Sequence, residues 1–193
     1  MKIIAICREY GACGHTVGRM VAEKLGIEVY DKDIVRSAAH ETGITENDIL
    51  AREETIRKSD SFIRAISPSV TYNQIDMIHD REKEAILRFA QNGPCVVVGR
   101  CADVILRDAG YDVLTVFLHA SEEDRRARVG ELIGTDNPSA VHKAIKSTDS
   151  AREAYYKYFT EKAWGDYANY DLMLDVGTLG PEKCAGLICA AAE

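Results

Sequence analysis

Residues 3–25 read IIAICREYGACGHTVGRMVAEKL, and this stretch decides how the rest of the chain is interpreted. The apolar, β-branched run at 3–7 is typical of a buried parallel strand. After a glycine-containing turn, apolar residues recur at helical spacing from Val17 to Leu25, and Gly26 is a suitable helix stop. The stretch predicts a strand, a tight turn and a helix. In that arrangement, backbone N–H groups and the helix N-terminus can hold an anion.

The turn departs from the usual phosphate-binding loop, GxxxxGK[ST]. By spacing, Gly14 stands where the lysine for the β- and γ-phosphates is expected, and His15 stands at the magnesium-binding hydroxyl. Thr16 carries a hydroxyl, but it lies one residue after the position of the motif's Ser or Thr. Arg8 and Cys13 stand at the two glycines of the motif. By spacing alone the motif fails, which favours a structural glycine turn that binds nothing.

Bulk properties limit the class of protein. The chain has 193 residues, of which 46% are hydrophobic and 28% charged, so it is long enough for one globular domain spanning 1–193. The sequence shows no apolar run of membrane-spanning length and no signal peptide, which predicts a cytoplasmic protein with no membrane partner. A net charge of −7 argues against general nucleic-acid binding but leaves room for a small anionic substrate beside local arginines.

The six cysteines form no CxxC pair, which predicts free thiols in a reducing compartment. A metal site made of Cys13, His15 and Cys101 is a minor alternative.

The remaining chain alternates strands and helices. Apolar runs predict strands at 27–31, 95–99, 112–120 and 170–176. Helices are expected over most of 33–93 with a break at 67–70, over 102–110, from 121 onward with a break near Asn137–Pro138, and over 181–193. This order implies an α/β fold in which helices cover both faces of a mostly parallel sheet. The insert at 33–93 could also form a dimer face.

Several arginines follow the predicted strands. Arg100 lies at the carboxyl end of the strand at 95–99, where ligands of open α/β sheets collect, and bidentate phosphate binding suits it there. Arg125 and Arg128 are three apart and are expected on one helix face, with Arg152 further on. The alternative is a solvated face of ion pairs. The aromatic residues at 155–159 and Trp164 could stack on a base, but packing of a lid onto the body fits them better.

A cysteine-dependent phosphatase is a second chemical interpretation. Cys13 and Arg19 have the C-x5-R spacing of a thiolate nucleophile and its arginine. However, helical periodicity points Arg19 outward, and Met20 replaces the hydroxyl that would tune the thiolate.

Taken together, these segments resemble the cytidylate kinase-like family, a branch of the nucleoside monophosphate kinases. The resemblance runs nearly end to end and rests on ICREYGACGHTVGRMVAEKLGIEVYDKDIV, GPCVVVGRCADVIL, VFLHASEEDRRARV and SAREAYYKYFTEKAWGDYANYDLMLDVGTLG. Members of this branch commonly carry a loop such as REYGSGG, so the absent lysine is a trait of the branch. Cytidylate kinases proper differ in having the lysine and a GRD-type run in place of GRCAD.

The resemblance implies a three-layer P-loop NTPase fold with a monophosphate-binding helical insert at 33–93 and a lid at 121–165. It also implies transfer of the γ-phosphoryl group of ATP, with Mg²⁺, onto CMP or dCMP. The implied donor-phosphate residues are Gly11, Ala12, Cys13, Gly14, His15 and Thr16, with Thr16 also a magnesium ligand. The implied cations at the phosphates are Arg100, Arg125, Arg128 and Arg152, and Arg8 at the end of the first strand is a further candidate catalytic residue. The implied acceptor-side residues are Asp31, Arg36, Arg100 and Asp103.

Phosphoryl transfer depends mainly on positioning and on positive charge around the phosphate oxygens. The absent lysine therefore needs a substitute, and we hypothesise that Arg8 or a lid arginine provides it. Arg19 is a further candidate cation. The rival interpretation is a nucleotide- or phosphate-binding regulatory protein that kept the fold without catalysis.

Overall fold

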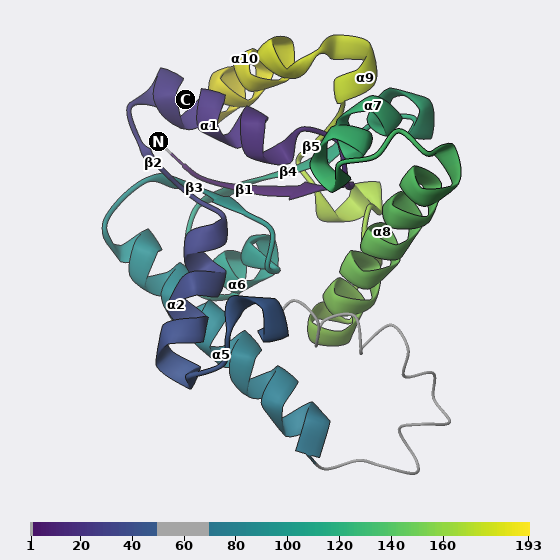
Figure 1. The fold of residues 1–193 in the computed structure, drawn as a ribbon. Coiled ribbons are helices and arrows are strands. Elements are labelled where there is room, and N and C mark those ends of the chain that lie inside the picture. The colour runs from purple at the N-terminus through teal and green to yellow at the C-terminus, as the bar shows by residue number, and fades with distance from the viewer. Residues whose placement is uncertain (1, 50–69) are drawn as a thin grey trace.

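The computed structural model describes residues 2–49 and 70–193 (Figure 1). Within these ranges one parallel sheet has the strand order β2-β3-β1-β4-β5. The strands are β1 (Ile3–Arg8), β2 (Glu28–Tyr30), β3 (Cys95–Val98), β4 (Val113–His119) and β5 (Leu172–Asp175). The parallel sheet predicted from the apolar runs is confirmed, and its central strand leads into the glycine turn.

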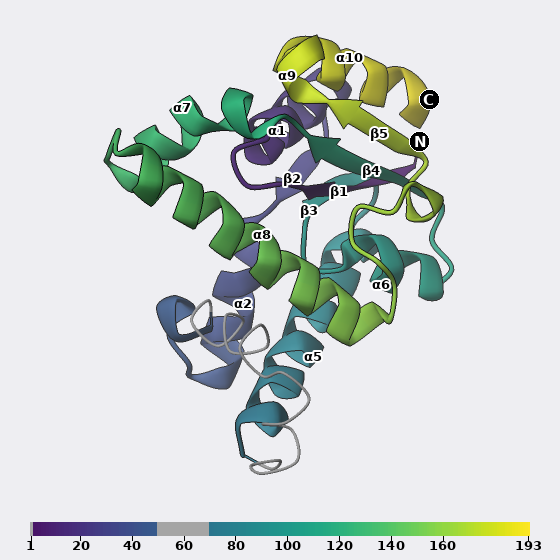
Figure 2. The same ribbon diagram turned by 90° about the vertical axis from the view of Figure 1, so that its right-hand side faces the viewer.

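Helices cover both faces of this sheet (Figures 1 and 2). They are α1 (Gly14–Leu25), α2 (Lys32–Thr42), α5 (Val70–Gln91), α6 (Ala102–Asp108), α7 (Glu122–Ile133), α8 (Pro138–Thr160), α9 (Val176–Leu179) and α10 (Pro181–Ala192), with a 3-10 turn η1 at Tyr167–Asn169. Because side chains alternate along β1, Ile4 and Ile6 pack in the core beneath α1 and α10, whereas Ala5 and Cys7 pack with α5, α6 and α8.

The two regions expected to surround the site are helical. α2 and α5 form the described part of the predicted insert, and the expected break at 67–70 falls mostly outside the described residues. α7 and α8 form the predicted lid region. Their break is confirmed: α7 ends before Gly134, and the side chain of Asn137 caps α8 by accepting the N–H groups of Ser139 and Ala140.

Two further expectations concern the whole chain. All six cysteines are free thiols, as predicted. None of the helices within the described ranges has the length and apolarity needed to cross a bilayer.

Candidate functional site

The turn between β1 and α1 has the backbone of an anion-binding loop. Gly11 has φ 86° and Cys13 has φ 54°, so the chain reverses sharply before α1 begins at Gly14. No side chain caps this helix, and the N–H groups of Gly14, His15 and Thr16 have no acceptor among the described residues. Unsatisfied donors at a helix N-terminus attract an anion, as expected from the sequence.

The side chain of Arg8 lies across the place where the missing lysine would begin. A Cβ atom built on Gly14 would lie 2.6 Å from Cγ of Arg8, and a Cβ atom on Gly99 would overlap its Nη1. The guanidinium reaches Asp31, with 3.6 Å between Nη2 and Oδ1. Glycine is therefore favoured at 14, where the Arg8 side chain leaves no room for a Cβ atom, and at 99, where φ is 83°.

Two more arginines approach from distant segments. Nη1 of Arg152, on α8, donates to the carbonyl oxygen of Arg8 at 2.8 Å, and its guanidinium lies 5.7 Å from the ring centroid of Tyr10. Desolvation, with added repulsion from Arg8 and Arg100, lowers the pKa of Arg152 to about 9. Desolvation also lowers the pKa of Arg100, and the Arg8 charge adds to this shift. These guanidinium groups repel one another, and an anion between them would relieve that repulsion.

Arg100 sits in a strained turn between β3 and α6. Gly99, Arg100 and Cys101 have successive φ values of 83°, 61° and 55°. A non-glycine residue in the left-handed region costs about 1–2 kcal/mol, and such strain is concentrated at functional sites. The turn directs the Arg100 side chain toward α5, where its Nη1 lies 3.2 Å from Oε1 of Glu82.

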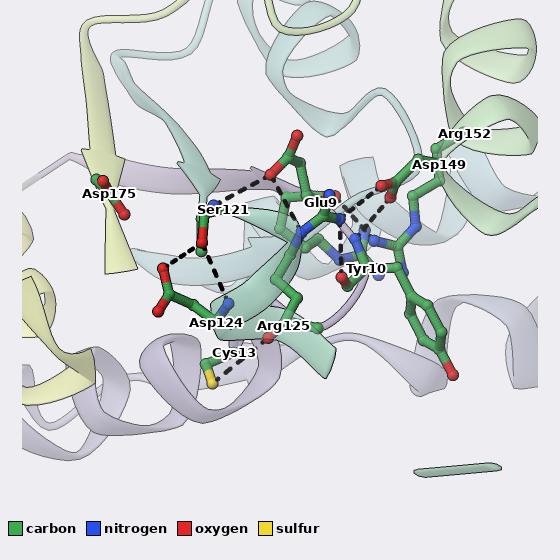
Figure 3. Close-up of polar contacts among 12 residues, drawn as sticks. Glu9, Tyr10, Cys13, Ser121, Asp124, Arg125, Asp149, Arg152 and Asp175 are labelled. Atoms are coloured by element: carbon green, nitrogen blue, oxygen red, sulfur yellow. Dashed lines mark hydrogen bonds and ion pairs between the residues drawn. The ribbon is translucent and has the colours of Figure 1, made fainter. Parts of the chain in front are cut away.

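Residues of α7 and α8 hold the loop from above, as Figure 3 shows. The N–H of Tyr10 donates to Oδ1 of Asp149 at 2.7 Å. Nη1 of Arg125 donates to the carbonyl oxygen of Tyr10 at 3.0 Å and to Oδ2 of Asp149 at 2.6 Å. Both backbone groups of Tyr10 are thus fixed by side chains more than 100 positions away in sequence.

A second set of contacts fixes the same region. Oε2 of Glu9 accepts the N–H of Ala120 at 3.1 Å and lies 3.6 Å from Nε of Arg125. A Cβ atom on Gly11 would lie 2.8 Å from Cγ2 of Val129, so α7 packs directly against the turn. Sequence reasoning singled out Asp149 only as part of a charged segment with Lys146 and Arg152. It did not identify Glu9 or Glu82, because a single carboxylate among many carries no local pattern that reveals a partner far along the chain.

The expectation that Arg125 and Arg128 share one face needs correction. Arg125 is buried, whereas the Arg128 side chain is 46% exposed and pairs with Glu131. The inner face of α7 is defined by Arg125 and Val129 at i,i+4 spacing, which turns Arg128 toward solvent.

Two acceptor-side candidates also lie apart from the loop. Arg36 on α2 pairs with Asp33 and Glu46, and its side chain is 63% exposed. Asp103 on α6 is buried, and its Oδ2 accepts the hydroxyl of Tyr156 at 2.7 Å. This contact joins α6 to α8 inside the core.

The aromatic residues of α8 pack within the protein. Tyr155 and Tyr156 are buried in the core beneath the sheet. The ring of Trp164 meets Phe117 edge to face at 5.2 Å between centroids. These contacts agree with the packing role preferred from the sequence.

The first turn of α1 and the end of β2 offer oxygen ligands for Mg²⁺. Oδ2 of Asp31 lies 3.0 Å from Nδ1 of His15, which places the carboxylate beside the start of α1, where Thr16 carries its hydroxyl. One carboxylate and one hydroxyl, completed by phosphate oxygens, suit Mg²⁺. Within residues 2–49 and 70–193 no group of three or more His, Cys, Asp or Glu side chains could hold a metal, which leaves the Cys13–His15–Cys101 alternative without support.

The phosphatase interpretation lacks its arginine. Sγ of Cys13 lies 3.8 Å from the carbonyl oxygen of Gly11, whereas Arg19 is exposed, as its helical position predicted. Cys13 therefore lacks the C-x5-R arginine that the phosphatase mechanism would place beside its thiolate.

We therefore expect Cys13→Ser to leave hydrolysis of p-nitrophenyl phosphate at the background level of the wild-type protein. Cys189→Ser, which changes another half-buried thiol, is the matched control. Loss of a measurable hydrolytic rate in Cys13→Ser alone would contradict this expectation.

Comparisons with known proteins agree with this geometry. The family model described as "Cytidylate kinase-like family" matches residues 3–178. No curated protein matches the chain in sequence.

Solved structures share the architecture. An uncharacterized protein from Eubacterium ventriosum ATCC 27560 superposes with a TM-score of 0.74 at 24% identity, covering 100% of this chain and 98% of that one. Shikimate kinase from Acinetobacter baumannii has a TM-score of 0.53 at 16% identity, with coverage of 99% and 92%. Deoxyadenosine kinase from M. mycoides has a TM-score of 0.52 at 13% identity, with coverage of 97% for both chains. The chain therefore has the P-loop kinase fold.

Proposed function

Because the chain belongs to the cytidylate kinase-like family, we propose that it transfers the γ-phosphoryl group of ATP to a nucleoside monophosphate, with CMP or dCMP as the leading acceptor. The family and fold support a nucleotide or small-molecule kinase in general. The choice of a cytidine monophosphate rests on the resemblance of the chain to the cytidylate kinases.

The observation that carries the proposal is that the Arg8 side chain passes over the uncapped start of α1, while Arg100 and Arg152 lie near enough to repel its guanidinium group. A turn that served only as a structural connection would gain nothing from mutually repelling guanidinium groups. A phosphoryl group in transfer, by contrast, spreads negative charge over several oxygens and is stabilised by cations placed around them.

The position of each group then indicates its role in the proposed reaction. The amides that begin α1 would bind the donor phosphates, and Arg8 would take the part of the absent lysine. Arg152, on α8, would stabilise the transferred phosphoryl group, and Arg100 would bind the acceptor phosphate. Mg²⁺, when bound near Asp31 and Thr16, would neutralise charge on the donor phosphates.

The contacts of the loop with α7 and α8 favour a role for these helices in covering the phosphate site. Asp149 and Arg125 fix Tyr10 from α8 and α7, so both helices are held against the loop. In this position they would exclude water from a reactive phosphoryl group.

Coupled ADP release with a panel of acceptors tests the proposal. We expect ATP turnover to rise above the acceptor-free rate with CMP or dCMP and to require Mg²⁺. AMP, UMP, shikimate and gluconate serve as comparison acceptors. ATP binding without acceptor-stimulated turnover for any of these would favour the regulatory interpretation instead.

A further inference from the structure

Glu82, on α5, carries a carboxyl group inside the protein directly opposite Arg100. The residue is 0% exposed, and its Oε1 lies 3.2 Å from Nη1 of Arg100. Its Oε2 accepts the hydroxyl of Tyr155 at 2.6 Å. Oε1 has no hydrogen-bond partner despite the nearby guanidinium, so the contact with Arg100 is ionic and lacks hydrogen-bond alignment. Buried polar atoms are rarely left in this state without a functional reason.

The groups next to Glu82 leave Arg100 as its charged neighbour. From α8, Tyr155 has a pKa raised by burial, and from the turn after β3, Cys101 likewise has a raised pKa. On α5 itself, Nδ1 of His79 lies 2.8 Å from the Tyr155 hydroxyl, and burial lowers the His79 pKa to about 4. All three groups are therefore neutral near pH 7 to 8.

Charges in the next layer act on these neighbours. Arg8 and Asp31 act on Arg100 with opposite effects on its pKa. On α6, Asp103 raises the pKa of Cys101. Within the described residues, the arginine–glutamate contact is thus the ionic link between the insert helix α5 and the phosphate site.

We propose that Glu82 is an internal counterion of Arg100, that an incoming phosphate displaces it, and that a bound anion therefore holds Glu82 in its protonated form. The inference rests on the proposed function, in which Arg100 receives the acceptor phosphate. The displaced carboxylate stays buried, where an uncompensated negative charge is costly, so it takes a proton from solvent. Glu82 is then a positioning residue that links acceptor binding to pH.

The direction of this link follows from the chemistry of the pair. Burial raises the pKa of Glu82 to about 8. Below that pH the Glu82 carboxyl group is neutral and does not compete with an anion for Arg100. Above it, the carboxylate competes with the anion for Arg100 and repels it. Affinity for an anion at Arg100 should thus fall by about fourfold between pH 6.5 and pH 8.5, in proportion to the protonated fraction.

Sulfate is the right probe because it stays doubly charged over this range and needs no phosphoryl transfer. Calorimetric titration at constant ionic strength, in two buffers with different ionisation heats, reports both affinity and proton uptake. Arg100→Gln identifies the component of binding that depends on Arg100. We expect the wild-type protein to take up about three quarters of a proton per sulfate at pH 8.5 and almost none at pH 6.5.

Variants of two α5 residues distinguish the effect of Glu82 on sulfate binding from the titration of other groups. Glu82→Gln should bind sulfate with little change over the same pH range and without proton uptake. Glu84→Gln removes an exposed carboxylate from the same helix and should behave like the wild-type protein. Arg152, with its own pKa near 9, would give a fall with pH that persists in Glu82→Gln.

Either a persistent fall in Glu82→Gln or a wild-type affinity that is independent of pH overturns the proposal. Absence of any Arg100-dependent sulfate binding also overturns it. If Glu82→Gln does not fold, proton uptake by the wild-type protein alone decides. Failure of the kinase assay together with normal pH-linked sulfate binding would refute the proposed function and leave this inference intact.

Discussion

Replacing Arg8 by alanine is expected to lower kcat by roughly 10²–10³-fold, as for loss of one preorganised donor at a transition state. The reason is the path of the side chain, which starts at the end of β1, passes Gly14 and reaches Gly99. It thereby brings a cation to the region that a loop lysine would serve. Coupled ADP release at saturating ATP and acceptor measures the effect. A thermal melt of the variant confirms that the fold is retained.

A variant that moves the positive charge from position 8 to position 14 gives the most direct control. Gly14→Lys alone should also be impaired, because its Cβ would lie 2.6 Å from Cγ of Arg8. The double variant Arg8→Gly/Gly14→Lys removes this clash and restores the first glycine and the lysine of GxxxxGK, with Cys13 still at the second glycine position, so it should recover much of the lost rate. Arg128→Ala, which removes an exposed arginine paired with Glu131, should remain near wild type. Equal rates in wild type, Arg8→Ala and Arg128→Ala would show that Arg8 does not replace the lysine.

The sequence was sufficient for the parts of the site that are local along the chain. Strand, turn and helix follow from residues 3–25, and Arg100 was correctly placed at the end of a strand, because hydrophobic periodicity and glycine positions are short-range signals. The order of strands and helices likewise predicted the parallel sheet, since crossover connections permit few topologies.

The sequence could not supply the pairing of distant polar groups. The contact of Asp149 with Tyr10 joins residues 139 positions apart, and that of Glu82 with Tyr155 spans 73. Nor could spacing decide which of Arg125 and Arg128 turns inward, because both fit an amphipathic helix until the packing of α7 on the loop is known. These choices depend on tertiary packing, which a single sequence does not encode in any short pattern.

Asp149→Ala should lower the free energy of unfolding by about 3 kcal/mol, which is near the lower end of the cost of breaking a buried ion pair. The Asp149 side chain is 17% exposed and the Arg125 side chain is 8% exposed, so the pair is largely shielded from water. Removing the carboxylate leaves the N–H of Tyr10 without its acceptor and the Arg125 guanidinium without its closest counterion. The loss stays moderate because Arg125 keeps its contacts with Glu9 and the Tyr10 carbonyl.

Two further variants show how much of this loss of stability comes from the charge of Asp149 and from the burial of its ion pair. Asp149→Asn keeps an oxygen that can accept the Tyr10 N–H but removes the charge, so its destabilisation should fall between wild type and Asp149→Ala. Glu131→Ala breaks an exposed pair with Arg128 on the same lid and should change stability by less than about 0.5 kcal/mol. Urea denaturation, with the slope compared among variants, gives all three values. If Asp149→Ala costs no more than Glu131→Ala, the lid contacts do not stabilise the loop, and closure over the phosphates must depend on bound nucleotide instead.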